Sequence, residues 1–227
     1  MHRTEAGWQI LGEALLVRTY SIGPGNTTNS VVCRLADGGL GIISPPSHID
    51  DAALVELADF GVVRAIIAPN AYHTAGLQPW QERFPEAGVY AGEAALKRIR
   101  GKIRTLDIAP VTELATAEGV ALVQLPRMRN GETFLRARAG SKTVWYGGDV
   151  FLNMTGLSGV MGFFFRTVGM GPGFVVNPIN RWFMMRDRAA VSDWAKEALV
   201  GVDVVIPGHG EILEEAGLEA RMVEMLG

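Results

Sequence analysis

Three side chains that can bind a metal follow three apolar segments of the sequence. His73 comes shortly after "AIIAP", Asp149 follows "TVWYGG", and His209 follows "DVVIPG". Imidazole nitrogens and carboxylate oxygens are ligands of catalytic zinc and of non-haem iron(II). Because loops at strand ends carry functional residues on a rigid scaffold, we take these three residues as candidate metal ligands.

Each candidate also has an interpretation that needs no metal. A single histidine after a strand can cap a backbone group or pack in the core, and an aspartate after two glycines can bond the backbone of a turn. The functional interpretation is stronger for His209, because Gly208 and Gly210 on either side of it allow backbone angles that aim an imidazole.

Apolar periodicity predicts that strands and helices alternate along the chain, with an antiparallel meander in the second half. Mixed sheets packed between helices are the fold class that this pattern favours, in a single domain over residues 1–227. The expected strands cover residues 14–22, 30–35, 39–44, 62–69, 88–91, 119–126, 132–140, 142–148 and 202–207. The expected helices cover residues 47–60, 77–84 and 93–99, one after Asp187, and one ending near Leu226.

Composition narrows the class of protein. Of the 227 residues, 48% are hydrophobic and 20% are charged, which predicts a folded chain with a sizeable core. The net charge of −3 comes from interspersed charges, so nucleic acid is not an expected partner. The one cysteine, Cys33, excludes an internal disulfide and is expected in the core. The N-terminal sequence lacks the pattern of a signal peptide, which predicts a cytoplasmic protein.

The segment 150–185 is almost free of charge. Arg166 and Arg181 interrupt it, and glycines and prolines punctuate it, so we do not expect a membrane span. A lid, a homodimer contact or a surface patch that touches lipid are the alternatives. The strongest candidates for exposed apolar contacts are Trp182 and the run 163–165, although core packing would also accommodate any one of them.

Taken together, four stretches resemble the ordered motif series of the metallo-β-lactamase-fold hydrolases. They are "APNAYHTAGL", "LPRMRNGE", "YGGDVF" and "VVIPGHGEI", and the resemblance extends from about Thr27 to the C-terminal helix. The residues of these stretches are most similar to those of a metallo-hydrolase-like subgroup whose first metal motif is degenerate. The resemblance implies an α/β fold, a four-layered αβ/βα sandwich with its site at the edge of the two sheets.

The resemblance also implies which metal positions are kept. The family binds two metals, and the positions of the first are matched here by Ala68, Asn70 and Met128. A methyl group and a thioether bind zinc poorly among nitrogen and oxygen ligands, so we expect this first site to be empty. The second site keeps His73, Asp149 and His209 as ligands, whereas Tyr72 replaces the family's aspartate.

Two functions follow from this pattern. The first is a hydrolase with at most one divalent metal, zinc or, as second choice, iron(II), acting on a small-molecule ester or amide. In it, Tyr72 or Asn70 would hydrogen-bond the water or a developing oxyanion. The second is a catalytically inactive, metal-free binding or scaffolding protein. In it, His73, Asp149 and His209 would persist as a hydrogen-bonded cluster.

Overall fold

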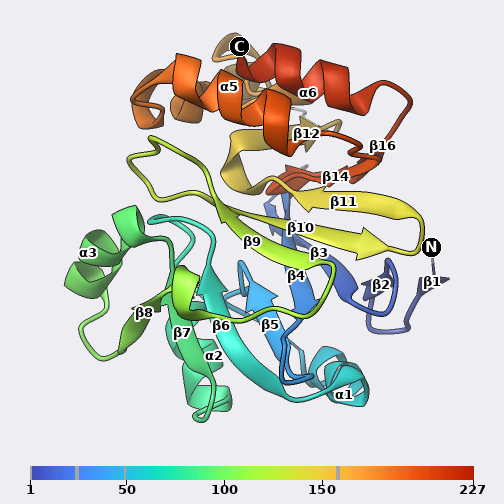
Figure 1. Ribbon diagram of the computed structural model, residues 1–227, viewed down its shortest axis with the longest axis vertical. Helices are drawn as coiled ribbons and strands as arrows, with labels where there is room; N and C mark the ends of the chain where they lie inside the picture. The colour runs from blue at the N-terminus through green and yellow to red at the C-terminus, as the bar shows by residue number, and fades with distance from the viewer. Residues whose placement is uncertain (1, 24–25, 49, 157–158) are drawn as a thin grey trace.

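Two β-sheets lie face to face in the middle of the molecule, and helices cover the outer face of each (Figure 1). The computed structural model describes residues 2–23, 26–48, 50–156 and 159–227. The order of layers is helices, sheet, sheet, helices. This confirms the four-layered αβ/βα sandwich of the α/β class that the sequence predicts.

The first sheet contains eleven strands within the described residues. β15 lies between β4, to which it is antiparallel, and β12, to which it is parallel. The C-terminal part of the chain thereby joins the N-terminal sheet. The strands are β1 (His2–Arg3), β2 (Gln9–Ile10), β3 (Leu15–Gly23), β4 (Asn26–Arg34), β5 (Leu40–Ile43), β6 (Val63–Ala68), β7 (Gly88–Ala91), β8 (Ile108–Pro110), β12 (Phe151–Met154), β13 (Gly173–Val176) and β15 (His209–Gly210).

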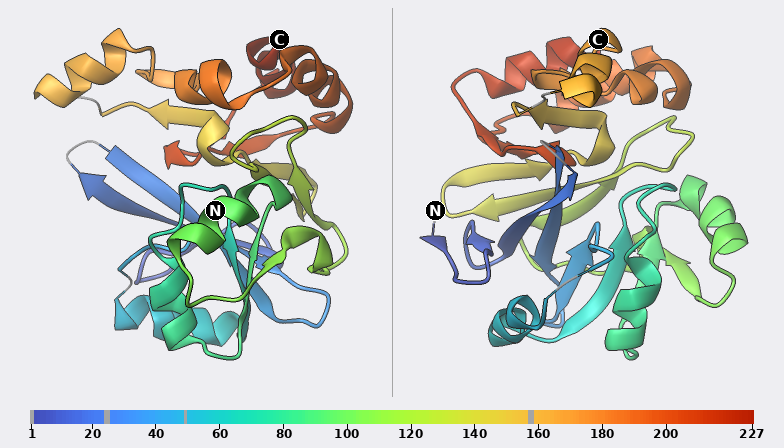
Figure 2. Two further views of the ribbon diagram at one scale, coloured as in Figure 1. Left: turned by 90° about the vertical axis from the view of Figure 1, so that its left-hand side faces the viewer. Right: turned by 180° about the vertical axis from the view of Figure 1, so that it is seen from behind.

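Helices connect the parallel strands β5, β6, β7 and β8. α1 (Asp51–Phe60), α2 (Leu77–Arg83) and α3 (Glu93–Lys102) follow β5, β6 and β7 in turn. They cover the outer face of the first sheet (Figures 1 and 2). Because the carboxyl ends of parallel strands meet at one edge of a sheet, the loop after β6 opens at that edge.

The second sheet contains five strands in the order β16-β14-β11-β10-β9 within the described residues. β14 is parallel to β11, and the connection between them includes a crossover helix, α5 (Arg188–Ala198). α6 (Leu218–Leu226) lies beside α5 over the same face (Figure 1). The strands are β9 (Val120–Gln124), β10 (Thr133–Ala139), β11 (Lys142–Tyr146), β14 (Val204–Ile206) and β16 (Leu213–Glu214).

Three apolar clusters fill the spaces between the four layers. Alternate residues of one strand enter different clusters, because side chains of a strand point to opposite faces. In β4, Val32 packs toward the helical side of the first sheet, whereas Cys33 packs between the sheets and is fully buried, as expected. In β11, Val144 packs between the sheets and Trp145 packs toward α5 and α6.

The apolar segment 150–185 forms more regular structure than the sequence predicts. It contains β12, β13, a helix, α4 (Gly159–Thr167), and a π-helical turn, η3 (Asn180–Met184). Residues 157–158 of this segment lie outside the described residues. Short strands interrupted by glycine and proline give a weak sequence signal, which explains why β12 and β13 were not expected.

α4 extends away from both sheets (Figure 2, left). Phe163, Phe164 and Trp182 are exposed, which confirms two of the three phenylalanines and the tryptophan as surface residues. Phe165 instead packs against Leu152. Across the described ranges, no helix is both long enough and apolar enough to cross a membrane.

Aspartates at the N-caps determine where two helices begin. α1 begins at Asp51 and not near Ser47 as predicted, because the Asp50 side chain accepts a hydrogen bond from the Ala53 amide at 2.7 Å. Asp187 caps α5 as predicted and accepts from the Ala190 amide at 3.0 Å. A capping carboxylate satisfies an amide that has no partner within the helix.

Replacing Asp187 with alanine should lower the free energy of unfolding by about 1 kcal/mol, because the first turn of α5 loses its cap. Chemical denaturation measures the change. Asp193→Ala, an exposed position on the same helix, is the control and should change the free energy of unfolding by less than about 0.5 kcal/mol. Equal effects of the two substitutions would contradict the capping role.

Candidate metal centre

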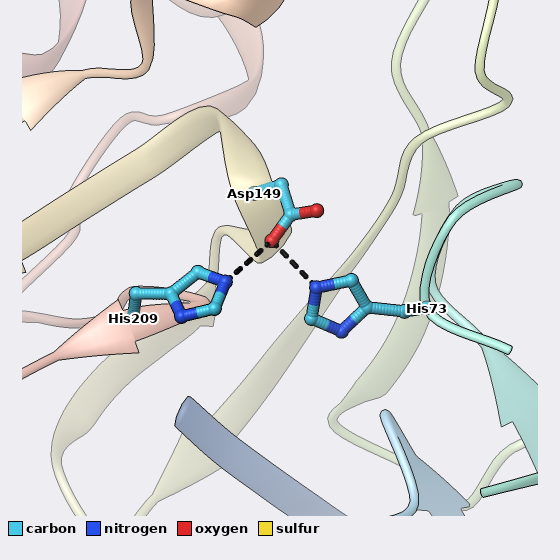
Figure 3. Close-up of side chains that lie close together, drawn as sticks. All are labelled: His73, Asp149 and His209. Atoms are coloured by element: carbon cyan, nitrogen blue, oxygen red, sulfur yellow. Dashed lines mark ion pairs between the residues drawn. The ribbon is translucent and has the colours of Figure 1, made fainter. Parts of the chain in front are cut away.

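The structure brings His73, Asp149 and His209 together (Figure 3). Asp149 Oδ1 lies 2.8 Å from His73 Nε2 and 3.3 Å from His209 Nε2. One ligand atom from each residue lies within 4.8 Å of the other two. His73 comes from the loop after β6, Asp149 from the 3-10 turn η2 (Gly148–Val150) after β11, and His209 from β15. All three therefore come from segments that follow central strands.

A second set of contacts holds the two imidazole rings. His209 Nδ1 lies 3.1 Å from the Thr27 carbonyl oxygen, which can only accept, so Nδ1 carries the hydrogen. In neutral His209 the Nε2 lone pair therefore faces Asp149. His73 Nδ1 lies 2.8 Å from Ser44 Oγ. Ser44 has a φ of 55°, a left-handed conformation that is rare for residues other than glycine and that recurs at functional sites.

The arrangement around Asp149 Oδ1 fits a cation better than a set of hydrogen bonds. Oδ1 is buried, and no hydrogen-bond donor among the described residues is directed at it, although two imidazole nitrogens lie close by. The Nε2 lone pair of neutral His209 and the Asp149 oxygen that it faces repel each other unless a positive charge lies between them. Two histidines and one carboxylate, each oriented by an outer contact, are a recognised ligand set for zinc or iron(II).

The pKa shifts of the cluster show how the neighbouring histidines compensate the charge of Asp149. Burial alone would raise the pKa of Asp149, but the adjacent His73 and His209 hold it well below its usual range. Burial alone would lower the pKa of His73, but the charge of Asp149 and the contact with it raise it above its usual value. Without a metal, the cluster therefore favours an ionised Asp149 beside a protonated His73, and a bound cation would supply the same positive charge.

Behind Asp149 lies a buried polar network that the sequence did not reveal. Asn70 Nδ2 donates to Asp149 Oδ2 at 3.1 Å and to Glu132 Oε1 at 3.3 Å. The Asp149 amide donates to the same Glu132 oxygen at 3.0 Å. Asn130 Nδ2 donates to Glu132 Oε2 at 2.8 Å. Gly148 has a φ of 49°, and a Cβ there would collide with Glu132 Oε1, so the glycine permits this close packing.

Glu132 is the acid of this network whose pKa is raised. Its side chain is fully buried, and burial together with the negative charge of Asp149 raises its pKa to about 8. The carboxyl of Glu132 is therefore protonated near neutral pH. A neutral Glu132 leaves Asp149 as the one ionised carboxylate of the network.

The loop that carries His209 is fastened to β4. Asn29 Nδ2 donates to the carbonyls of Pro207 at 2.8 Å and Gly210 at 3.0 Å. Thr28 Oγ1 and the Asn29 amide both donate to the Gly208 carbonyl. Gly210 has a φ of 92°, and a Cβ at this position would collide with the backbone of β12. The two glycines around His209 are thus required by close backbone packing as well as by the turn.

Comparison with known proteins gives a fold but no close relative. No model of a protein family matches the chain, and no curated protein matches it. Among solved structures, the metal-soaked Flv1 flavodiiron core from Synechocystis sp. PCC6803 matches with a TM-score of 0.65 at 13% identity, over 96% of this chain and 60% of that chain. A metallo-beta-lactamase from Pontibacter korlensis matches with a TM-score of 0.64 at 11% identity, over 96% of this chain and 97% of that chain. The chain has the metallo-β-lactamase fold.

A further match is the DIM-1 metallo-beta-lactamase exposed to ceftazidime, with a TM-score of 0.60 at 16% identity, over 100% of this chain and 98% of that chain. At these identities the likeness concerns the fold. Relative to the Flv1 core, this chain spans 60% of the length. The metallo-β-lactamase fold that the sequence motifs imply is confirmed.

The positions matched to the family's first metal do not line one site in this metallo-β-lactamase fold. Ala68 lies in the cluster under α1 to α3, and Met128 lies in the cluster under α5 and α6. Asn70 alone contacts the His-Asp-His cluster, through Asp149. The alignment that assigns Ala68 and Met128 to one metal site is therefore not matched by the structure, because the two side chains pack into different apolar layers.

Of the two predicted catalytic residues, Asn70 is fully buried, and Tyr72 is 46% exposed. The Asn70 oxygen accepts from the amides of Tyr72 and His73, so this side chain is occupied by internal contacts. The Tyr72 hydroxyl contacts Met184 Sδ at 3.9 Å, and the Arg98 guanidinium lies 4.6 Å from the Tyr72 ring centre. A direct role for either residue in catalysis stays a prediction.

Sequence reasoning missed Glu132, Ser44 and Asn29. Glu132 could have been found as the one acid in "RNGETFLRA", because a carboxylate at the start of a buried strand needs partners. Asn29 belongs to the polar run "NTTNS" at the start of a strand whose other end is apolar. Ser44 gave no signal, since its role depends on a backbone conformation.

Replacing Asn29 with alanine should lower the free energy of unfolding by about 3 kcal/mol, because the buried carbonyls of Pro207 and Gly210 lose their donor. It should also weaken metal binding through the displaced His209. Denaturation and zinc titration measure the two effects. Asn177→Ala, which removes a contact to the nearby Ile179 amide, is the control with a loss of about 1 kcal/mol or less. Unchanged zinc affinity in the Asn29 variant would contradict the positioning role.

Glu132→Gln should change how stability depends on pH in chelator-treated protein. The pKa of Glu132 rises to about 8 in the folded state, so its contribution to stability is full at low pH and is lost as the pH rises through about 8. Between pH 5 and 8 the free energy of unfolding of the wild type should fall relative to the variant, by at most about 1.4 kcal/mol per pH unit. Parallel pH curves for the two proteins would show that Glu132 is ionised when folded.

Proposed function

We propose that this protein is a metal-dependent hydrolase that holds a single divalent ion with His73, Asp149 and His209. The observation that carries the proposal is Asp149 Oδ1, a buried oxygen beside two imidazole nitrogens with no hydrogen-bond donor directed at it. The presence of the same fold in metallo-beta-lactamases supports hydrolysis as the reaction type. This ligand set suits both zinc and iron(II). Zinc is the first choice of ion and iron(II) the second.

When bound, such an ion lowers the pKa of a coordinated water to about 7 and so supplies a nucleophile at neutral pH. The protein contributes orientation. Ser44 and the Thr27 carbonyl fix the two imidazole rings, and Asn70 fixes the second oxygen of Asp149. Fixed ligands lose little further conformational freedom when a substrate binds.

The cluster opens to a pocket of about 210 Å³ that His73, His209 and Tyr72 line together. The imidazole side chains each keep 19% of their surface exposed, and Asp149 keeps 15%. Solvent and a small reacting group therefore reach the cluster. We propose a small-molecule ester or amide as the occupant of this pocket, and a hydrogen bond from Tyr72 to a developing oxyanion stays a prediction. Location in the cytoplasm and self-association through the segment 150–185 stay predictions.

A metal-free binding protein is the second candidate function. The specific observation in its favour is the group of exposed large side chains in and after α4, which suits contact with another surface. They are Phe163, Phe164, Val168, Ile179, Trp182 and Phe183. In that case the three candidate ligands would serve as a buried polar cluster.

Metal content separates the two functions. The full-length protein, purified without chelator and dialysed, should contain about one zinc or iron per chain by elemental analysis. His209→Ala should lose most of that metal, because only two ligands remain. His48→Ala replaces an exposed histidine outside the cluster and is the control that should keep the metal.

A wild-type protein that stays free of metal after incubation with zinc and with iron(II) would exclude the hydrolase. Equal metal content in the wild type and in His209→Ala would place the ion elsewhere. The same dialysed samples can be assayed with chromogenic esters, where activity should follow the metal content.

A further inference from the structure

A second pocket lies next to the candidate metal centre and is positively charged. It has a volume of about 660 Å³, and its walls come from α3 and from the segments around Arg129 and Met184. The Arg129 amide donates to the Met184 carbonyl at 2.9 Å, which holds these two segments together. Three cationic side chains line it, Lys97, Arg98 and Arg129. Among the described residues, no aspartate or glutamate lines it.

The cations of this pocket are not neutralised by the protein. Within the described part of the chain, Lys97 and Arg129 make no ion pair, and both are exposed. Arg98 also has no carboxylate partner there and instead lies over the Tyr72 ring. Asn130, which lines the pocket, donates to Glu132, and the Glu132 side chain is fully buried. Charges of one sign in a concave site concentrate ligands of the opposite sign.

The concentration of positive charge in this pocket results from the fold and not from the overall composition. The sequence as a whole carries interspersed charges and a net charge of −3. α3 nevertheless places Lys97 and Arg98 in adjacent positions, and the loop before β10 adds Arg129 from a distant part of the chain. The expectation of evenly spread charge therefore fails at this surface.

The remaining walls of the pocket are apolar. Tyr72 and Phe183 provide aromatic rings, and Met184 provides a thioether. Phe183 is 65% exposed, so its ring is accessible to a bound molecule. A pocket with cations on one wall and rings on another suits a small molecule that carries an anionic group next to an apolar part.

Tyr72 connects this pocket to the candidate metal centre. Its side chain lines both pockets, and it directly precedes His73 in the sequence. A ligand whose anionic group lay against Lys97 and Arg129 could therefore extend past Tyr72 toward the His-Asp-His cluster. A pocket positioned in this way holds one end of a molecule while the other end approaches the reacting centre.

We propose that Lys97, Arg98 and Arg129 form a binding site for the phosphate or carboxylate group of a small molecule, with Tyr72 and Phe183 contacting its apolar part. The use of this site for substrate rests on the proposed hydrolase function, whereas anion binding itself does not. The site contains none of the three candidate metal ligands.

Three probes of similar size test the proposal: phenyl phosphate, benzoate and uncharged phenol. Binding to the full-length protein is followed by two-dimensional NMR titration at low ionic strength. At least one anionic probe should bind at least tenfold more tightly than phenol, and its affinity should fall as salt is added. Whichever of phenyl phosphate and benzoate binds more tightly identifies the anionic group that the pocket prefers.

Variants locate the bound probe. Lys97→Ala combined with Arg129→Ala should weaken binding of the anionic probe by about tenfold or more and leave binding of phenol unchanged. Lys196→Ala removes an exposed cation on α5 and is the matched control that should change nothing. All the substituted side chains are exposed, and unchanged thermal unfolding should confirm that each variant folds.

His209→Ala separates this proposal from the hydrolase. Unchanged binding of the anionic probe in His209→Ala supports a site apart from the metal ligands, whether or not the wild type contains metal. Loss of binding in that variant would place the anion at the metal centre and overturn the proposal. The proposal would also be overturned if neither anionic probe bound more tightly than phenol. Equal affinity of the anionic probe for the wild type and the double variant would overturn it as well.

Discussion

The site is organised around one buried carboxylate. Asp149 keeps 15% of its side-chain surface exposed, and burying most of an ionised group is costly unless partners compensate its charge. His73 and His209 face one of its oxygens, and Asn70 bonds the other. Protonation of nearby Glu132 avoids a second negative charge in the same space. His73 and Asn70 come from the loop after β6, His209 from β15 and Glu132 from the segment before β10, so the folding of several segments is tied to the charge of a single residue.

Close backbone packing makes that arrangement possible. Gly148 lets Glu132 reach the backbone of η2, and Gly210 lets the last loop lie against β12. Asn29 then fastens this loop to β4 through two carbonyls. Glycine is needed at both positions because a Cβ would meet another backbone or a carboxylate. The position of His209 therefore depends on packing between distant strands, not only on the conformation of its own turn.

Much of the fold could be predicted from the sequence, because apolar alternation and helical periodicity report directly on the layers. The three candidate ligands could be found because each follows a strand and matches a motif. Glu132, Ser44 and Asn29 could not, because their roles depend on contacts between segments far apart in the chain. Ala68 and Met128 were instead assigned to a site that the structure does not form from them. A motif alignment places them at metal positions, while the direction of each side chain depends on the strand and loop geometry.

The three candidate ligands come from separate parts of the chain, and His209 lies on a strand that joins the C-terminal part to the first sheet. An ion held by them would link the loop after β6, the turn after β11 and the edge beside β4. A ligand that binds only the folded state stabilises it in proportion to the logarithm of its concentration. Metal supply would then influence how long the folded protein survives as well as what it catalyses, so scarcity could act first on the amount of protein.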